Sequence, residues 1–163
     1  MGMVGCFAAV DSDTLSKLKE DPYLIDGYLH SDGGDSDPPN CIDVDKAWHG
    51  IHYLLTGRTD EGSEPLSLAV MGGTEIGEDV GYGPARFLEP EQVRRIAAWL
   101  PDDTVFKSRF DPQAMEKAKI YPEIIWVRDE DDALDYLVEN YRELVAFYKS
   151  AAIRGDGAIL WLS

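Results

Sequence analysis

Two histidines with a cluster of possible ligands just before them are the strongest metal candidates in this chain. His49 and His52 are three residues apart, which places them on one face of a predicted helix, and Cys41, Asp43 and Asp45 precede them. Thiolate, carboxylate and imidazole groups at this spacing could hold a zinc ion. A short zinc site, however, has four ligands at tight spacing, and the helix also offers His52 a half-buried, hydrogen-bonded structural role. We therefore expect no metal, and His49 and His52 are the residues to test.

A glycine-rich segment, GGTEIGEDVGYGP at 72–84, invites a phosphate-binding interpretation. A P-loop requires Gly-x4-Gly-Lys-Ser/Thr, and no lysine lies between Ile51 and Phe106. The dinucleotide pattern Gly-x-Gly-x-x-Gly fails because Arg86 stands where the third glycine belongs. We therefore expect a wide surface turn with left-handed glycines, and no cofactor.

Two side chains beside this segment could still serve a ligand. Tyr82 and Arg86 flank Gly83-Pro84, and loops carry binding residues more often than cores do. One hypothesis is thus a small-ligand-binding protein or an enzyme, with a pocket formed by His52, Tyr82 and Arg86. Covalent catalysis has little support, because Cys6 lies in an apolar run and no Gly-x-Ser-x-Gly elbow occurs. No catalytic residue is assigned.

The charge of the chain favours a different function. The 163 residues include 15 Lys and Arg against 31 Asp and Glu, a formal charge of −16. Such a charge opposes binding to nucleic acid and to anionic membranes, and no segment approaches the roughly 20 apolar residues of a membrane span. A basic protein is an electrostatically favourable partner. The candidate contacts are Asp32, Asp35, Asp37, Asp131 and Asp132.

The leading hypothesis is therefore a non-enzymatic, acidic protein-binding module. The alternative interpretation of the charge is that it only keeps the protein in solution. A third alternative is that the chain is a subunit of a homo-oligomer. The N-terminus has no basic, then apolar, leader pattern, and two cysteines do not form a disulfide framework. We expect a cytoplasmic location.

The elements that must position these residues follow from hydrophobic periodicity and breakers. Strands are predicted at 3–10, 85–88, 123–128 and 158–162, and helices at 12–21, 43–56, 91–100 and 131–153, with a short helix after Pro112. The run 66–71 is ambiguous, and 31–40 is predicted to be a mobile loop. Helix starts can be capped by Ser12 or Asp13, by Asp102 or Asp103, and by Asp111. Helix ends can be formed by Gly57 and Gly155.

This order predicts one domain of the α/β class, with a mixed β-sheet covered by helices, or alternatively an α+β fold.

Several segments together resemble a known family. They are MGMVG at 1–5, IDVDKAWHGIHYLLTG at 42–57, PLSLAV at 65–70, GYGPAR at 81–86, IYPEIIW at 120–126 and the helix at 136–155. In this order they are similar to the YfbM-like family of bacterial proteins, a domain of unknown function. The resemblance covers residues 1–163 and implies a single α/β domain. It implies no reaction and no functional residue.

Overall fold

One five-stranded sheet organises the molecule, in the order β2-β1-β5-β4-β3. The computed structural model describes residues 2–30 and 37–163. The strands are β1 (Gly5–Val10), β2 (Cys41–Asp43), β3 (Thr74–Asp79), β4 (Pro84–Leu88) and β5 (Gly157–Leu162). The helices are α1 (Ser12–Glu20), α2 (Leu24–Leu29), the 3-10 turn η1 (Asp45–Ala47), α3 (Trp48–Thr56), α4 (Leu68–Met71), α5 (Pro90–Trp99), α6 (Asp103–Ser108), α7 (Pro112–Lys117) and α8 (Ile125–Arg154).

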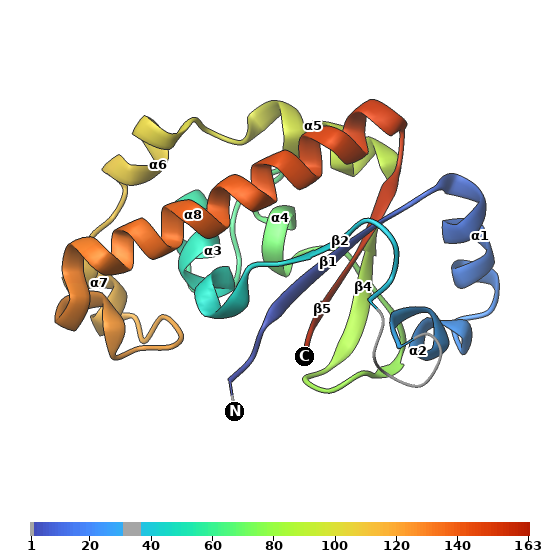
Figure 1. Cartoon of the computed structure of the whole chain (residues 1–163), viewed down its shortest axis with the longest axis horizontal. Coiled ribbons are helices and arrows are strands. Elements are labelled where there is room, and N and C mark those ends of the chain that lie inside the picture. Colours follow the sequence, from blue (N-terminus) through green and yellow to red (C-terminus); the bar gives the residue numbers. More distant parts are fainter. Residues whose placement is uncertain (1, 31–36) are drawn as a thin grey trace.

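Helices lie on both sides of this sheet (Figure 1). The long helix α8 crosses one face together with α3 and α5, and α1 and α2 lie on the other. The predicted class, a sheet covered by helices, is confirmed. The expected mixture of strand directions is wrong for residues 2–30 and 37–163, because all four strand pairings there are antiparallel. Periodicity indicates which residues are buried but says nothing about strand direction.

Residues of the central strands alternate between two cores. Phe7 and Leu160 are paired across β1 and β5 and face α8, whereas the neighbouring pair Ala8 and Ile159 faces α1 and α2. This alternation follows from the two-residue period of a strand. All residues of β5 up to Trp161 are buried, which fits the predicted fully buried strand.

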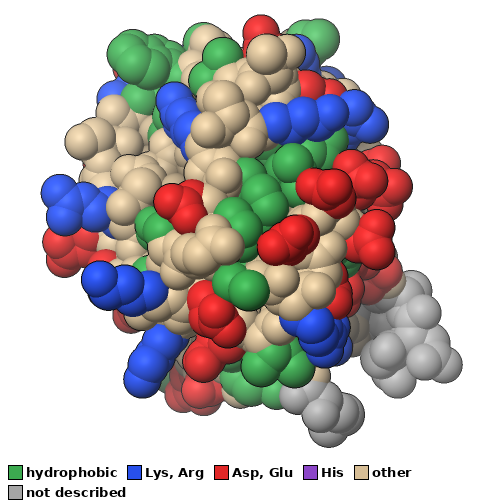
Figure 2. All heavy atoms as spheres, turned by 90° about the vertical axis from the view of Figure 1, so that its left-hand side faces the viewer, with side chains coloured by type: hydrophobic (Ala, Val, Ile, Leu, Met, Phe, Trp, Pro, Cys, Tyr) green, Lys and Arg blue, Asp and Glu red, His purple; other side chains and the backbone are tan. Residues whose placement is uncertain are grey.

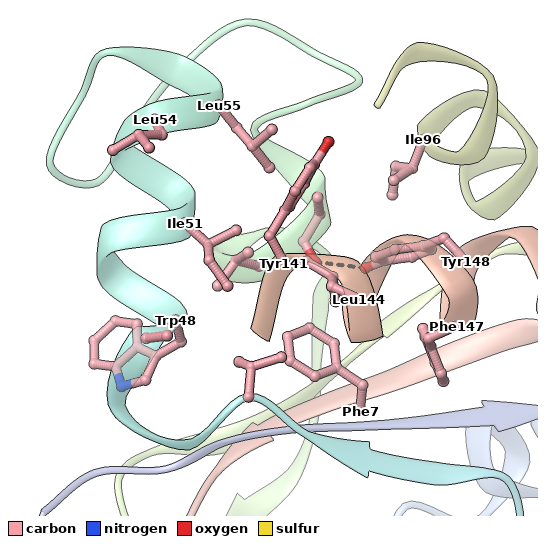
Figure 3. Close-up of a cluster of buried hydrophobic side chains, with 14 of the residues drawn as sticks. Phe7, Trp48, Ile51, Leu54, Leu55, Ile96, Tyr141, Leu144, Phe147 and Tyr148 are labelled. Carbon is pink, nitrogen blue, oxygen red and sulfur yellow. Dashed lines mark hydrogen bonds between the residues drawn. The ribbon is translucent and has the colours of Figure 1, made fainter. Parts of the chain in front are cut away.

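The core on the α8 side is rich in aromatic residues (Figure 3). Phe106 and Tyr141 stack with ring centroids 3.8 Å apart, and Phe7 lies 5.9 Å from Phe147. The Tyr148 hydroxyl donates to the Ala69 carbonyl at 2.5 Å, the bond drawn as a dashed line in Figure 3. This bond connects α8, which contains Tyr148, to α4, which contains Ala69. It also satisfies two buried polar groups at once.

The strand predicted at 123–128 is wrong. Ile125 begins α8, which runs to Arg154 with a kink at Glu130, whose φ is 36° and ψ −101°. The Trp126 side chain is fully buried, and its indole N–H donates to the Ile120 carbonyl at 2.7 Å. A short apolar run cannot distinguish a strand from a buried helical turn, and here the tertiary contacts decide.

The glycine-rich segment contains a strand that its sequence pattern does not indicate. Residues 74–79 form the edge strand β3, joined to β4 by residues 80–83. The left-handed glycines are confirmed, since Gly77 has a φ of 76° and Gly83 of 100°. Gly77 lies where the pairing is irregular between Ile76 and Asp79, as expected for a bulge. Only Ile76 of β3 is buried, which explains why the strand gave no apolar signal.

Most predicted helix ends are confirmed. The side chains of Asp102 and Asp111 cap α6 and α7, and Gly57 and Gly155 end α3 and α8 in the left-handed conformation. The cap of α1 is Asp11, not Ser12 or Asp13, because the Asp11 carboxylate accepts from the Thr14 amide at 2.7 Å.

Three other segments differ from the prediction. The helix predicted at 43–56 begins as the 3-10 turn η1, the ambiguous run 66–71 contains the short helix α4, and α2 was not predicted. Of the loop expected at 31–40, residues 31–36 lie outside the described residues, as do the candidates Asp32 and Asp35.

Candidate functional site

Tyr82 and Arg86 lie together in one open pocket of about 260 Å³. Five elements or their ends contribute to it, from the start of α3 to the end of β5. The lining residues are Trp48, Val70, Met71, Glu75, Tyr82, Gly83, Pro84, Arg86 and Leu162. The pocket therefore combines an apolar and aromatic wall with one basic and one acidic side chain.

Arg86 is held by the end of a helix. Its Nη1 donates to the Gly72 carbonyl at 2.9 Å, and its Nη2 to the Val70 carbonyl at 3.2 Å. These carbonyls belong to the C-terminal end of α4, where backbone acceptors lack helical partners and a cation is favoured. The guanidinium is thus fixed before any ligand arrives.

The charge of Arg86 is poorly hydrated. Burial is the largest effect on its pKa, which is lowered from the ordinary value of an arginine. Within the described ranges no carboxylate comes within 4 Å of this guanidinium. A guanidinium has five N–H donors in a rigid fork, and the hydrogen bonds to α4 engage only two of them. Such donors match a carboxylate or phosphate.

Two aromatic side chains shape the pocket. The indole N–H of Trp48 donates to the Met3 carbonyl at 3.0 Å, and its ring stacks on Tyr121 with centroids 5.6 Å apart. Tyr82 lies at the rim, where 48% of it is exposed. The pocket thus has one buried aromatic wall, Trp48, and one accessible aromatic edge, Tyr82.

His52 does not join this pocket. It is fully buried, and neither ring nitrogen has a hydrogen-bond partner among the described residues. Burial, and then the neighbouring His49, lower the pKa of His52 to about 4. This imidazole is therefore neutral near pH 7 and packs inside the protein.

His49 has a structural role. The Tyr121 amide donates to its Nδ1 at 2.9 Å, so the hydrogen is on Nε2, which donates to the Thr59 carbonyl at 2.6 Å. Both ring nitrogens are engaged, and no lone pair is left for a metal. Across residues 2–30 and 37–163, no group of three or more potential ligands is close enough to hold a metal ion.

Trp48 and Glu75 are pocket residues that sequence reasoning missed. Trp48 is only 6% exposed, as is typical of a core residue. Glu75 is the cross-strand partner of Arg86 in the β3–β4 hairpin. Recognising β3 as a strand would have placed Glu75 beside Arg86, because directly paired residues share one face.

The acidic candidates that the structure describes, Asp37, Asp131 and Asp132, do not share a surface. Asp131 and Asp132 are exposed on α8, and Asp132 lines a shallow hollow with Lys46 and Tyr136. Asp37 is also exposed. Burial, and in addition the charge of Asp37, raises the pKa of the Cys6 and Cys41 thiols. Both cysteines belong to the face covered by α1 and α2. Of the described candidates, Asp37 thus lies on the side of the sheet opposite to α8, which carries Asp131 and Asp132.

Charges of both signs are interspersed at the end of the molecule formed by α6, α7 and the first turns of α8. Figure 2 shows this face, where Lys and Arg side chains lie among the carboxylates. None of the helices among the described residues is long and apolar enough to cross a membrane.

Fold and pocket together define a class: a helix-covered antiparallel sheet whose edge hairpin forms one wall of an aromatic-lined pocket. Residues 1–161 match the family described as Domain of unknown function (DUF1877), and the chain belongs to that family. Protein YfbM of Escherichia coli (strain K12) is 26% identical, over 98% of this chain and 97% of that protein. The resemblance to YfbM-like proteins is thereby confirmed.

A solved structure supports the same fold. The crystal structure of YfbM from Escherichia coli, described as a protein of unknown function, matches with a TM-score of 0.70. The match covers 98% of this chain and 99% of that chain at 22% sequence identity. The likeness concerns the fold and assigns no activity.

Proposed function

We propose that this protein binds a small organic carboxylate in the pocket of Tyr82 and Arg86. The supporting observation is the Arg86 guanidinium, which is largely removed from water and has no carboxylate within 4 Å among the described residues. A partly buried cation that forms no ion pair at contact distance is costly, and an incoming carboxylate would compensate that cost with charge-assisted hydrogen bonds.

The shape of the pocket supports an apolar body for this ligand. Trp48, Met71 and Leu162 line the wall, and small-molecule sites combine such walls with a few fixed polar groups. The guanidinium is already immobilised by its bonds to Gly72 and Val70. Binding then requires little ordering of the protein, which favours affinity.

The proposal is tested by titrating the protein with 4-methylpentanoate and 3-phenylpropionate, while the indole N–H resonance of Trp48 is followed by NMR. We expect saturable shifts of this resonance that are lost in Arg86→Met, with folding of the variant checked by circular dichroism. Arg95→Met is the matched control, since Arg95 is a half-exposed arginine paired with Glu64 and does not line the pocket. Absence of any shift, or equal affinity in Arg86→Met, would overturn the proposal.

The docking of a basic protein stays a prediction. The described candidates Asp37, Asp131 and Asp132 are exposed, but they lie on opposite sides of the sheet, so that one basic surface does not reach all of them. For this reason we rank ligand binding first. Capture of basic partners that dissociate at high salt and depend on Asp131 and Asp132 would reverse this ranking.

A further inference from the structure

A second charge in the pocket, on Glu75, narrows the class of ligand. Glu75 and Arg86 are directly paired across β3 and β4 and both line the pocket. Directly paired residues have Cβ atoms about 5 Å apart, yet these two side chains form no ion pair within 4 Å. The pocket therefore presents a cation and an anion close together, neither neutralised by the other at contact distance.

A ligand with both charges complements this arrangement. A carboxylate can accept from the remaining N–H donors of Arg86, and an ammonium group can donate to the acceptor-only carboxylate of Glu75. In a complex with a monocarboxylate, the negative charge of the ligand would lie close to the negative charge of Glu75, which is unfavourable at short range. The pair Arg86 and Glu75 thus favours a ligand that carries a carboxylate and an ammonium group close together, as on the α-carbon of an amino acid.

The net charge of the protein favours the same ligand. At −16 the molecule repels approaching anions, and the summed field of many charges alters encounter rates. A zwitterion has no net charge and avoids this repulsion. The free volume of about 260 Å³ lies below the roughly 300 Å³ at which sites for drug-sized ligands begin, which suits one small molecule.

We propose that the ligand is an amino acid, or a close zwitterionic analogue, with an apolar side chain. This inference rests on the proposed function. Arg86 binds its carboxylate and Glu75 its ammonium group. The side chain packs among Trp48, Met71 and Leu162.

Three compounds of one shape separate the contributions of the two charges. L-leucine has both groups, 4-methylpentanoate lacks the ammonium, and 3-methylbutylamine lacks the carboxylate. We expect L-leucine to bind about tenfold more tightly than either analogue. L-leucine forms two charge-assisted contacts, whereas each analogue forms only one. L-phenylalanine, 3-phenylpropionate and 2-phenylethylamine repeat the comparison with an aromatic side chain. Affinities come from the Trp48 indole resonance and from calorimetry.

Glu75→Gln provides the decisive variant, since Glu75 is exposed and an exposed, isosteric substitution should change stability little. It should weaken L-leucine about tenfold, whereas 4-methylpentanoate should bind at least as tightly as before, because the substitution removes the repulsion from Glu75. Glu78→Gln is the matched control, an exposed carboxylate on the same strand that does not line the pocket, and it should change neither affinity.

The failures of the two proposals are distinguishable. If 4-methylpentanoate binds as tightly as L-leucine, or Glu75→Gln weakens both equally, the zwitterion inference is wrong while carboxylate binding stands. If no compound of either series shifts the Trp48 resonance, the proposed function fails and the inference fails with it.

Discussion

Arg86 and His52 both bury polar nitrogens, but in opposite surroundings. Arg86 has two carbonyl partners and lines an open pocket. His52 has no partner among the described residues and is sealed from solvent. Unused donors at an accessible wall can still be satisfied by a ligand, whereas unused nitrogens inside the core only lower stability. A buried polar side chain is therefore a candidate binding residue only where a ligand can reach it from solvent.

The strongest test of this comparison is the stability of Arg86→Met. The substitution removes both bonds to the end of α4 and leaves the carbonyls of Val70 and Gly72 without their partner. We expect the free energy of unfolding to fall by about 3 kcal/mol, since bonds from charged donors are worth roughly 1.5–3 kcal/mol each. Urea denaturation measures the change. An unaltered midpoint would mean that Arg86 does not secure α4.

The next largest effect concerns pH. Burial lowers the pKa of His52 to about 4, against 6.5 for an ordinary histidine. Between these values the unfolded chain binds a proton that the folded chain does not, so acidification favours unfolding. The His52 contribution should cost about 2 kcal/mol of stability between pH 7 and pH 5. Urea denaturation at the two pH values measures it.

His52→Leu is the variant that isolates this residue. It should remove most of the loss at pH 5, and at pH 7 it should be neutral or stabilising, because it removes two unpartnered nitrogens. His49→Leu is the contrasting control and should destabilise at pH 7, since it leaves Thr59 and Tyr121 without their partner. Equal pH dependence in wild type and His52→Leu would show that His52 does not titrate in this range.

The smallest effect on stability is expected at the rim of the pocket. Tyr82 is 48% exposed, so Tyr82→Ala should change the free energy of unfolding by less than about 0.5 kcal/mol. It should nevertheless weaken carboxylate binding several-fold, because it removes an aromatic edge from the ligand. Thermal unfolding and NMR titration measure the two quantities. A large loss of stability would make Tyr82 a structural residue.

The candidate site was only partly predictable. Tyr82 and Arg86 were found because they flank a Gly-Pro turn, and they do lie in one pocket. His52 was grouped with them, but Trp48, one turn earlier in α3, takes that place. Helical periodicity places Trp48 and His52 on the same element but does not say which one faces a distant hairpin. Glu75 was missed because β3 has a single buried residue.

What the sequence by itself determined is local: the buried strands at both ends of the chain, the capped starts of α6 and α7, the glycine ends of α3 and α8, and the family. Apolar spacing, capping side chains and glycines act over a few residues, so their effects can be predicted from the sequence alone. Only the tertiary structure decided the antiparallel pairing, the helical state of Trp126 and the juxtaposition of Arg86 with Glu75, α4 and Trp48. These depend on contacts between residues far apart in sequence, where packing outweighs local preference.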